Sequence, residues 1–298
     1  MMIIDPYRFG AGGLPYTPPL DANNAAAAYS IRKLRTAYEG SSMRVVNDSD
    51  EGLDIGFGDD GLLDTAAILA HVGSGGGYIQ SWYDQSGNGY DLRTESKSQA
   101  PIIAATGSIV QVNGLPAIEF DGANDDFRDT TGNGLVEIFK NIGYGSSFGV
   151  YKIENTTSSD FILHLINRNS GFGSARHAIY GNLVNGKLSL AGRRLDSDSN
   201  QFIDSASNYS SAQTLVTGII EYANSNAYLY VDGALEASTT SFQTAGLTSN
   251  TDSSVVIIGA DAVRYLNGFS QELIFYNTDI AADRAAIEAN INSYFSIY

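Results

Sequence analysis

The sequence predicts an all-β protein, a β-sandwich or jelly roll with a few short helices. Short runs of strand-forming residues follow one another through most of the chain beyond residue 100. The composition agrees, because 32 glycines and 18 tyrosines among 298 residues suit many short strands joined by tight turns. Pairs that favour hairpin turns separate several of the runs, at Asn113-Gly114, Asn185-Gly186 and Asp232-Gly233.

Residues 1–20 predict an extended N-terminal arm. Prolines at positions 6, 15, 18 and 19 exclude a regular helix there. The arm is nevertheless too apolar for a freely solvated tail, so we expect it to dock, either on its own domain or on a neighbouring subunit. The docking candidates are Ile3, Ile4, Tyr7 and Phe9. Residues 21–298 show no linker or internal repeat and predict one jelly-roll domain.

Three helices are predicted within that domain. Residues 24–38 place apolar side chains at helical spacing, Asp64 or Thr65 caps a helix over residues 66–72, and residues 281–295 carry an apolar stripe. The predicted strands cover residues 43–46, 53–57, 78–83, 101–105, 109–112, 117–120, 148–153, 161–166, 177–180, 187–191, 214–222, 227–231, 255–258 and 269–276.

The stretch from residue 78 to 92 contains the only tryptophan of the chain, followed by a tight turn. It begins as a strand, in which alternation puts Tyr78, Gln80 and Trp82 on one face. Two interpretations stay open at this point. The stretch is either a sugar-binding platform or a structural corner whose polar side chains satisfy the backbone of the turn. The candidate carbohydrate-binding residues are Trp82, Tyr83, Asp84, Gln85 and Asn88.

Charge and composition narrow the range of partners. The net charge of -16 repels phosphate and therefore disfavours nucleic acid and anionic membranes. The absence of cysteine excludes disulfides, cysteine-ligated zinc and thiol catalysis. We see no signal peptide, and no apolar run approaches the roughly 18 residues of a membrane span.

No cofactor is expected, with calcium as the one metal that the sequence suggests. An acidic loop follows a predicted strand, and calcium prefers oxygen ligands of the kind that this loop offers. The alternative is a solvated turn without a metal. The candidate ligands are Asp121, Asn124, Asp125 and Asp126.

Several strings of residues appear in an order that resembles a known family. Residues 27–34 are followed by Arg44-Val45, by residues 63–67 (Leu-Asp-Thr-Ala-Ala) and by residues 82–89 (Trp-Tyr-Asp-Gln-Ser-Gly-Asn-Gly). Over residues 25–92 the chain resembles the catalytic domain of the fungal-type α-L-arabinofuranosidase B family. The same stretch also resembles phage virion proteins, which open with a short arm like Ile4-Asp5-Pro6-Tyr7. Residues 228–233, 257–259 and 268–276 resemble laminin-G-like or concanavalin A-like jelly rolls.

The arabinofuranosidase resemblance implies a retaining glycosidase, a chemistry that needs two carboxyl groups. In that family the nucleophilic Glu precedes an Ala-Ile-Tyr string, and here His177 precedes Ala178-Ile179-Tyr180. The acid/base position is implied at Asp261. Because imidazole does not readily replace a carboxylate in a glycosyl-enzyme intermediate, we expect no catalytic residues. The cysteine pair and the second, sugar-binding domain of the family have no counterpart in this sequence.

The leading hypothesis is a non-enzymatic structural protein of a phage particle, such as a decoration, collar or tail-associated subunit. On this hypothesis the arm binds other virion proteins, the subunits are oligomeric on the particle, and the domain contacts a host-surface glycan. A virion protein is made in the host cytoplasm and needs no signal peptide, so the missing signal peptide agrees with this hypothesis. Two alternatives stay open: a carbohydrate-binding receptor module of a tail fibre, and an active retaining glycosidase.

Overall fold

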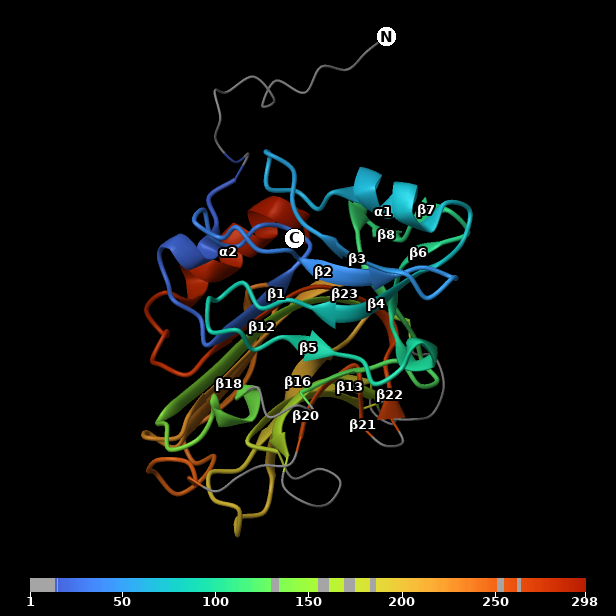
Figure 1. Cartoon of the computed structure of the whole chain (residues 1–298). Helices are drawn as coiled ribbons and strands as arrows, with labels where there is room; N and C mark the ends of the chain where they lie inside the picture. The colour runs from blue at the N-terminus through green and yellow to red at the C-terminus, as the bar shows by residue number, and fades with distance from the viewer. Residues whose placement is uncertain are drawn as a thin grey trace.

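The predicted all-β architecture is confirmed by the computed structural model of the chain (Figure 1). The structure describes residues 14, 16–129, 134–154, 161–168, 175–182, 186–250, 255–261 and 264–298. Within them the strands pair antiparallel throughout, and two α-helices are present. The neighbouring strands and their registers define a jelly-roll β-sandwich.

Strands of the first half are β1 (Ala27–Ser30), β2 (Met43–Val46), β3 (Gly52–Ile55), β4 (Gly77–Trp82), β5 (Leu92–Arg93), β6 (Ile102–Ala105), β7 (Ser108–Ile109), β8 (Gln111–Val112), β9 (Leu115–Pro116), β10 (Ile118–Asp121) and β11 (Phe127–Arg128). Those of the second half are β12 (Tyr144–Ile153), β13 (Phe161–Arg168), β14 (His177–Asn182), β15 (Lys187–Gly192), β16 (Gln201–Asn208), β17 (Gln213–Glu221), β18 (Asn226–Val231), β19 (Ala234–Thr239), β20 (Val255–Ile258), β21 (Ala260–Asp261), β22 (Arg264–Tyr265) and β23 (Asn267–Tyr276). The helices are α1 (Thr65–Val72) and α2 (Arg284–Phe295), with 3-10 turns η1 (Pro19–Asp21), η2 (Lys97–Gln99) and η3 (Leu135–Glu137).

The sheet divides into two layers at β4. One edge of β4 pairs with β2 along most of its length, while the other edge pairs with β6 at its start and with β5 at its end. From β6 one layer continues through β10, β23, β12, β17 and β18 to β19. From β5 the other layer continues through β11, β20, β13, β14 and β15 to β16. The far edges meet where Ser207 of β16 donates to Glu236 of β19, so the sheet is nearly closed.

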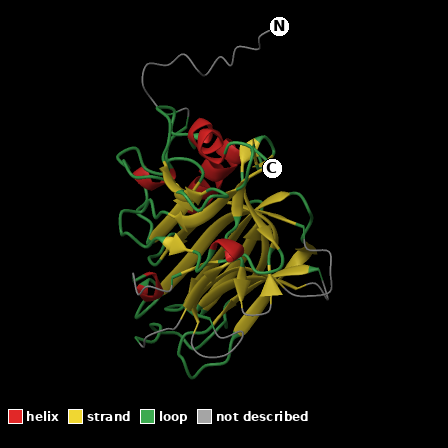
Figure 2. Ribbon diagram, turned by 45° about the vertical axis from the view of Figure 1, so that its right-hand side comes forward, coloured by secondary structure: helices red, strands yellow, loops and turns green. Residues whose placement is uncertain are grey.

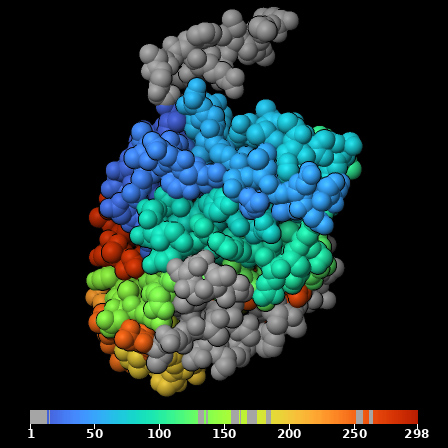
Figure 3. Space-filling view, in the orientation of Figure 1, coloured from blue at the N-terminus to red at the C-terminus, as the bar shows by residue number. Residues whose placement is uncertain are grey.

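The main core fills the space between the layers. Its aromatic members include Trp82, Phe127, Phe148 and Phe275, each with no exposed surface. Figure 2 shows the long strands running side by side, with α2 next to the C terminus at one end. In the space-filling view, the blue-to-teal first third of the chain gathers at the same end (Figure 3).

The predicted helix over residues 24–38 is wrong. Ala27 to Ser30 instead form β1, which pairs with β23 from Phe275 to Glu272. All four residues of β1 are buried, so the segment is packed on both faces. An amphipathic helix would bury one face only. Tertiary packing here overrides the helix propensity of an alanine-rich segment. The prediction for the second helix is confirmed, because Asp64 caps α1 by accepting from Ala67 N at 2.9 Å.

The end of the predicted arm packs on its own domain. The Tyr16 hydroxyl donates to the carbonyl oxygens of Lys33 and Gly61, both at 2.9 Å, and Asn290 Nδ2 donates to Thr17 O at 2.6 Å. Ordered packing thus begins before residue 21. The docking candidates Ile3, Ile4, Tyr7 and Phe9 lie outside the described residues.

Candidate functional site

The turn after β4 is held together by the carboxylate of Asp84. Its Oδ1 accepts from the N–H groups of Ala28 and Ser86, both at 2.9 Å. Its Oδ2 accepts from the Ser86 hydroxyl at 2.7 Å and from Tyr90 N at 3.1 Å. Asp84 is only 4% exposed. Its two carboxylate oxygens are buried and already hydrogen-bonded within the turn, so they are not on the surface where a ligand could bind.

Gln85 extends the same turn to the segment that follows β1. Its Oε1 accepts from Leu34 N at 2.8 Å, and its Nε2 donates to Ser30 O and Arg32 O, both at 3.1 Å. Asn88 Nδ2 donates to Ala26 O at 2.9 Å. These amides therefore serve the backbone of the segment around β1. Of the two interpretations of this stretch, the structural corner fits its contacts.

A β-bulge in β4 corrects the predicted alternation of side chains. Arg44 of β2 lies opposite Ser81 and Val45 lies opposite Ile79, which leaves Gln80 without a partner in β2. The extra residue turns Trp82 into the core, where it is fully buried, while Tyr78 and Gln80 stay on the outer face. The indole ring therefore offers no surface to a sugar.

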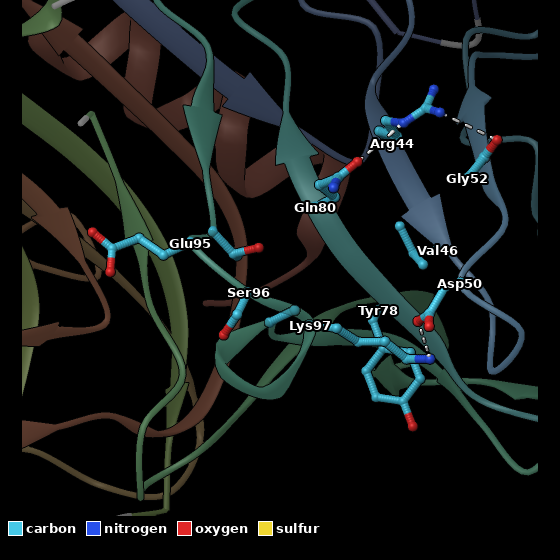
Figure 4. Close-up of a pocket in the computed structure, with 11 residues that line it drawn as sticks. Arg44, Val46, Asp50, Gly52, Tyr78, Gln80, Glu95, Ser96 and Lys97 are labelled. Carbon is cyan, nitrogen blue, oxygen red and sulfur yellow. Dashed lines mark hydrogen bonds and ion pairs between the residues drawn. The ribbon is translucent and has the colours of Figure 1, made fainter. Parts of the chain in front are cut away.

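The outward side chains of β4 line a groove of about 430 Å³ on the outer face of β2, β3 and β4 (Figure 4). Arg44 and Gln80 lie at one end, and Tyr78, Lys97 and Asp50 lie at the other. The remaining lining residues are Val46, Gly52, Thr94, Glu95, Ser96 and Ala100. A half-buried aromatic ring next to hydrogen-bond donors and acceptors is a composition that suits a polar ligand with an apolar face, such as a sugar.

The cations of the groove are each paired with a carboxylate. Arg44 Nη1 lies 3.0 Å from Asp54 Oδ1, and its Nε donates to Gln80 Oε1 at 3.1 Å. Lys97 Nζ lies 2.8 Å from Asp50 Oδ1 and 4.9 Å from the centre of the Tyr78 ring. The groove therefore presents charge-assisted donors and acceptors without a large excess of either sign.

The family nucleophile position lies in the core between the layers. His177 and His164 are fully buried, and their rings stack with centroids 5.7 Å apart and planes 8° apart. His177 Nε2 lies 2.8 Å from Ser147 Oγ, and His164 Nδ1 lies 3.1 Å from the Tyr151 hydroxyl. Burial lowers the pKa of His177 to about 3 and lowers the pKa of His164 as well. Both rings are thus neutral at physiological pH.

The implied acid/base position lies in the short two-stranded sheet of β21 and β22. Asp261 lies in β21 and pairs with Arg264 of β22, whose guanidinium lies 5.3 Å from the centre of the Tyr180 ring. Tyr180 and His177 are three residues apart on β14, so their side chains point to opposite faces.

The acidic loop after β10 is a turn that caps itself. Asp121 Oδ1 accepts from Ala123 N at 2.8 Å, Asp125 Oδ2 accepts from Asp121 N at 2.9 Å, and Asp126 pairs with Arg128 at 2.6 Å. Asn124, the fourth candidate, donates from Nδ2 to a backbone carbonyl at 2.9 Å. Among the described residues, no group of three or more acidic or histidine side chains is arranged to hold a metal. Calcium binding by this loop stays a prediction.

Comparison with known proteins supports the fold. No protein-family profile matches the chain, and no curated protein matches it in sequence. Among solved structures it is similar to a family 54 α-L-arabinofuranosidase soaked with a cyclic sulfate inhibitor, with a TM-score of 0.64 and 14% identity over 90% of this chain and 62% of that one. An arabinofuranosidase in complex with arabinofuranosyl-α-1,2-xylobiose gives a TM-score of 0.64 and 15% identity over 92% of this chain and 64% of that one.

The shared feature is the fold. This chain spans less than two thirds of the length of either enzyme. A weaker similarity, with a TM-score of 0.46 and 18% identity, covers 58% of this chain and 95% of a carbohydrate-binding module of the Ruminococcus gnavus IT-sialidase bound to α2,3-sialyllactose.

No helix among the described residues is both long enough and apolar enough to cross a membrane.

Sequence reasoning missed the groove. Its residues come from β2, β3, β4 and η2 and from the loops next to them, and no motif connects them. The available signal was the polar character of Arg44 and Gln80 within strand-like runs, which indicates an outward face. That signal does not predict where the outer surface forms a groove. The groove depends on the bulge at Gln80 and on the pairing of one edge of β4 with both β5 and β6, and both features are set by tertiary structure.

Proposed function

We propose that this chain is a non-enzymatic, glycan-binding jelly roll whose ligand lies in the groove on the outer face of β2, β3 and β4. The observation that carries the proposal is the groove itself, in which the Tyr78 ring stands beside Arg44, Gln80 and Lys97. Such a site can stack on the apolar face of a sugar and hydrogen-bond its hydroxyls. The carbohydrate ligands of the structural neighbours agree with this class of ligand.

The absence of catalysis is part of the proposal and rests on the position of the nucleophile. A retaining glycosidase needs two carboxyl groups about 5–5.5 Å apart around the scissile bond. Here a neutral, fully buried imidazole, His177, stands at the implied nucleophile position and contacts Phe139 and Ser147. His177 and the neighbouring His164 have no exposed surface.

Glycan binding is tested with a glycan array of neutral and sialylated sugars, followed by calorimetry on the best ligand. We expect Tyr78→Ala to weaken binding at least tenfold, because it removes the ring and its contact with Lys97. Tyr298→Ala is the matched control, since it removes a tyrosine that is 54% exposed beside α2. Equal affinities of Tyr78→Ala and the unmodified protein would refute the groove as the binding site.

We further propose that the chain is an oligomeric subunit of a phage particle, anchored to other virion proteins by residues 1–13. Support for this comes from the resemblance of the opening residues to phage virion proteins. Deleting residues 1–13 should prevent incorporation into particles and leave the domain folded, because Tyr16 and Leu20 keep their packing. Mass spectrometry of purified particles measures incorporation, and normal copy numbers of the truncated chain would contradict the anchoring role.

A further inference from the structure

A row of polar side chains continues from the groove across the outer face of β2 to β3. The Tyr83 hydroxyl donates to Asp54 Oδ1 at 2.7 Å, and the same oxygen accepts from Arg44 Nη1 at 3.0 Å. Arg44 in turn donates to Gln80 at 3.1 Å. Because Tyr83 follows β4, Asp54 lies on β3 and β2 runs between them, the Tyr83 side chain must lie across the face of β2. The hydrogen-bonded row thus joins Tyr83 to the groove.

We propose that the ligand is an uncharged oligosaccharide of several units, which lies along this row with one end at Tyr78 and the other at Tyr83. The inference rests on the proposed function and names the class of glycan. Asp54, which the Tyr83 hydroxyl contacts, lies two residues along and two strands across from Tyr78 in the register of β2, β3 and β4, which corresponds to about 12 Å. A single sugar ring does not span that distance, whereas a linear chain of a few rings does.

Charge selects against acidic sugars. Arg44 and Lys97 already have carboxylate partners in Asp54 and Asp50, so neither is left over for a ligand carboxylate. The hydrogen bonds from Tyr83 and Arg44 lower the pKa of Asp54, which keeps that carboxylate ionised. A sialylated or uronic acid chain would therefore find Arg44 and Lys97 already neutralised, on a protein whose net charge is -16.

The Tyr83 ring is held in place for this role. Burial of the ring and its hydrogen bond to Asp54 raise the pKa of Tyr83 to about 12, so the hydroxyl stays protonated and keeps donating. The side chain is only half-buried, which leaves ring surface open to solvent on the outer face. A fixed aromatic ring costs little side-chain entropy when a ligand binds.

The test compares affinities for linear neutral oligosaccharides of one to six units, from the xylo-, malto- and cello- series, by calorimetry on the full chain. We expect the tetrasaccharide of the preferred series to bind about tenfold more tightly than its disaccharide. Tyr83→Ala should reduce that ratio to about one, and Tyr83→Phe, which keeps the ring, should retain most of it. Tyr298→Ala should leave the ratio unchanged, and circular dichroism of each variant reports folding.

Two failures are distinguishable. If oligosaccharides bind and Tyr78→Ala weakens them, but the ratio is one or survives in Tyr83→Ala, the extended site is refuted and the groove stands. If no glycan of any length binds, the proposed function fails together with this inference. Tighter binding of sialyllactose than of lactose would overturn the assignment to uncharged sugars.

Discussion

Replacing Glu272 by alanine should lower the free energy of unfolding by about 3–5 kcal/mol, because it leaves the buried charge of Arg32 without a partner. Both side chains are fully buried, and Arg32 donates from Nε to Oε2 at 2.7 Å and from Nη2 to Oε1 at 2.9 Å. The Arg32 guanidinium also lies 4.6 Å from the centre of the Tyr294 ring and 5.2 Å from that of Tyr16. The pair therefore joins β23, α2 and the end of the arm.

Urea unfolding followed by the fluorescence of the buried Trp82 measures this loss. Asp54→Ala is the control, because it removes the carboxylate of a half-exposed pair and should cost about 1 kcal/mol or less. Arg32→Met combined with Glu272→Leu removes both charges and should cost less than Glu272→Ala alone. If Glu272→Ala costs no more than Asp54→Ala, the buried pair does not have the role described.

The strings that resemble the arabinofuranosidase family turn out to be in contact in the structure. Gln85 binds the backbone of Ser30 and Arg32, and the Ser30 hydroxyl donates to Glu272 at 2.8 Å. Residues 82–89 thus brace residues 28–34, which hold the buried ion pair. Because these contacts stabilise the sandwich without touching the groove or His177, the resemblance predicts the fold well and says little about activity.

The parts that sequence reasoning missed have a common physical cause. The strands β16 and β19 lie at the two far edges of the layers. Most residues of β16 and half of those of β19 are exposed, so these strands lack the apolar alternation that marks a half-buried strand. Likewise, β1 is buried on both faces and shows no period that distinguishes it from a helix. The bulge that separates Gln80 from Trp82 depends on strand pairing, which no local pattern records.

Acidification should destabilise the protein through its buried histidines. The pKa of His177 is about 3 in the folded chain and about 6.5 in the unfolded chain, so between these values the unfolded chain binds a proton that the folded chain does not. Stability from this group is therefore complete above pH 6.5 and lost as the pH falls. pH 4.5 lies about two units below the pKa of histidine in the unfolded chain, so His177 should contribute about 3 kcal/mol less to the free energy of unfolding there than at pH 7. His164 shifts the stability in the same direction.

His177→Gln isolates the effect, because glutamine can still hydrogen-bond Ser147 and does not titrate. The unmodified protein should exceed the variant in unfolding free energy at pH 7, and the difference should shrink by about 3 kcal/mol at pH 4.5. Carboxyl groups titrate in both proteins and cancel in this difference, including Asp125, whose burial raises its pKa to about 7. A difference that stays constant with pH would mean that His177 is already charged, or solvated, in the folded core. The nucleophile position would then be open to solvent, and the argument against catalysis would lose its main support.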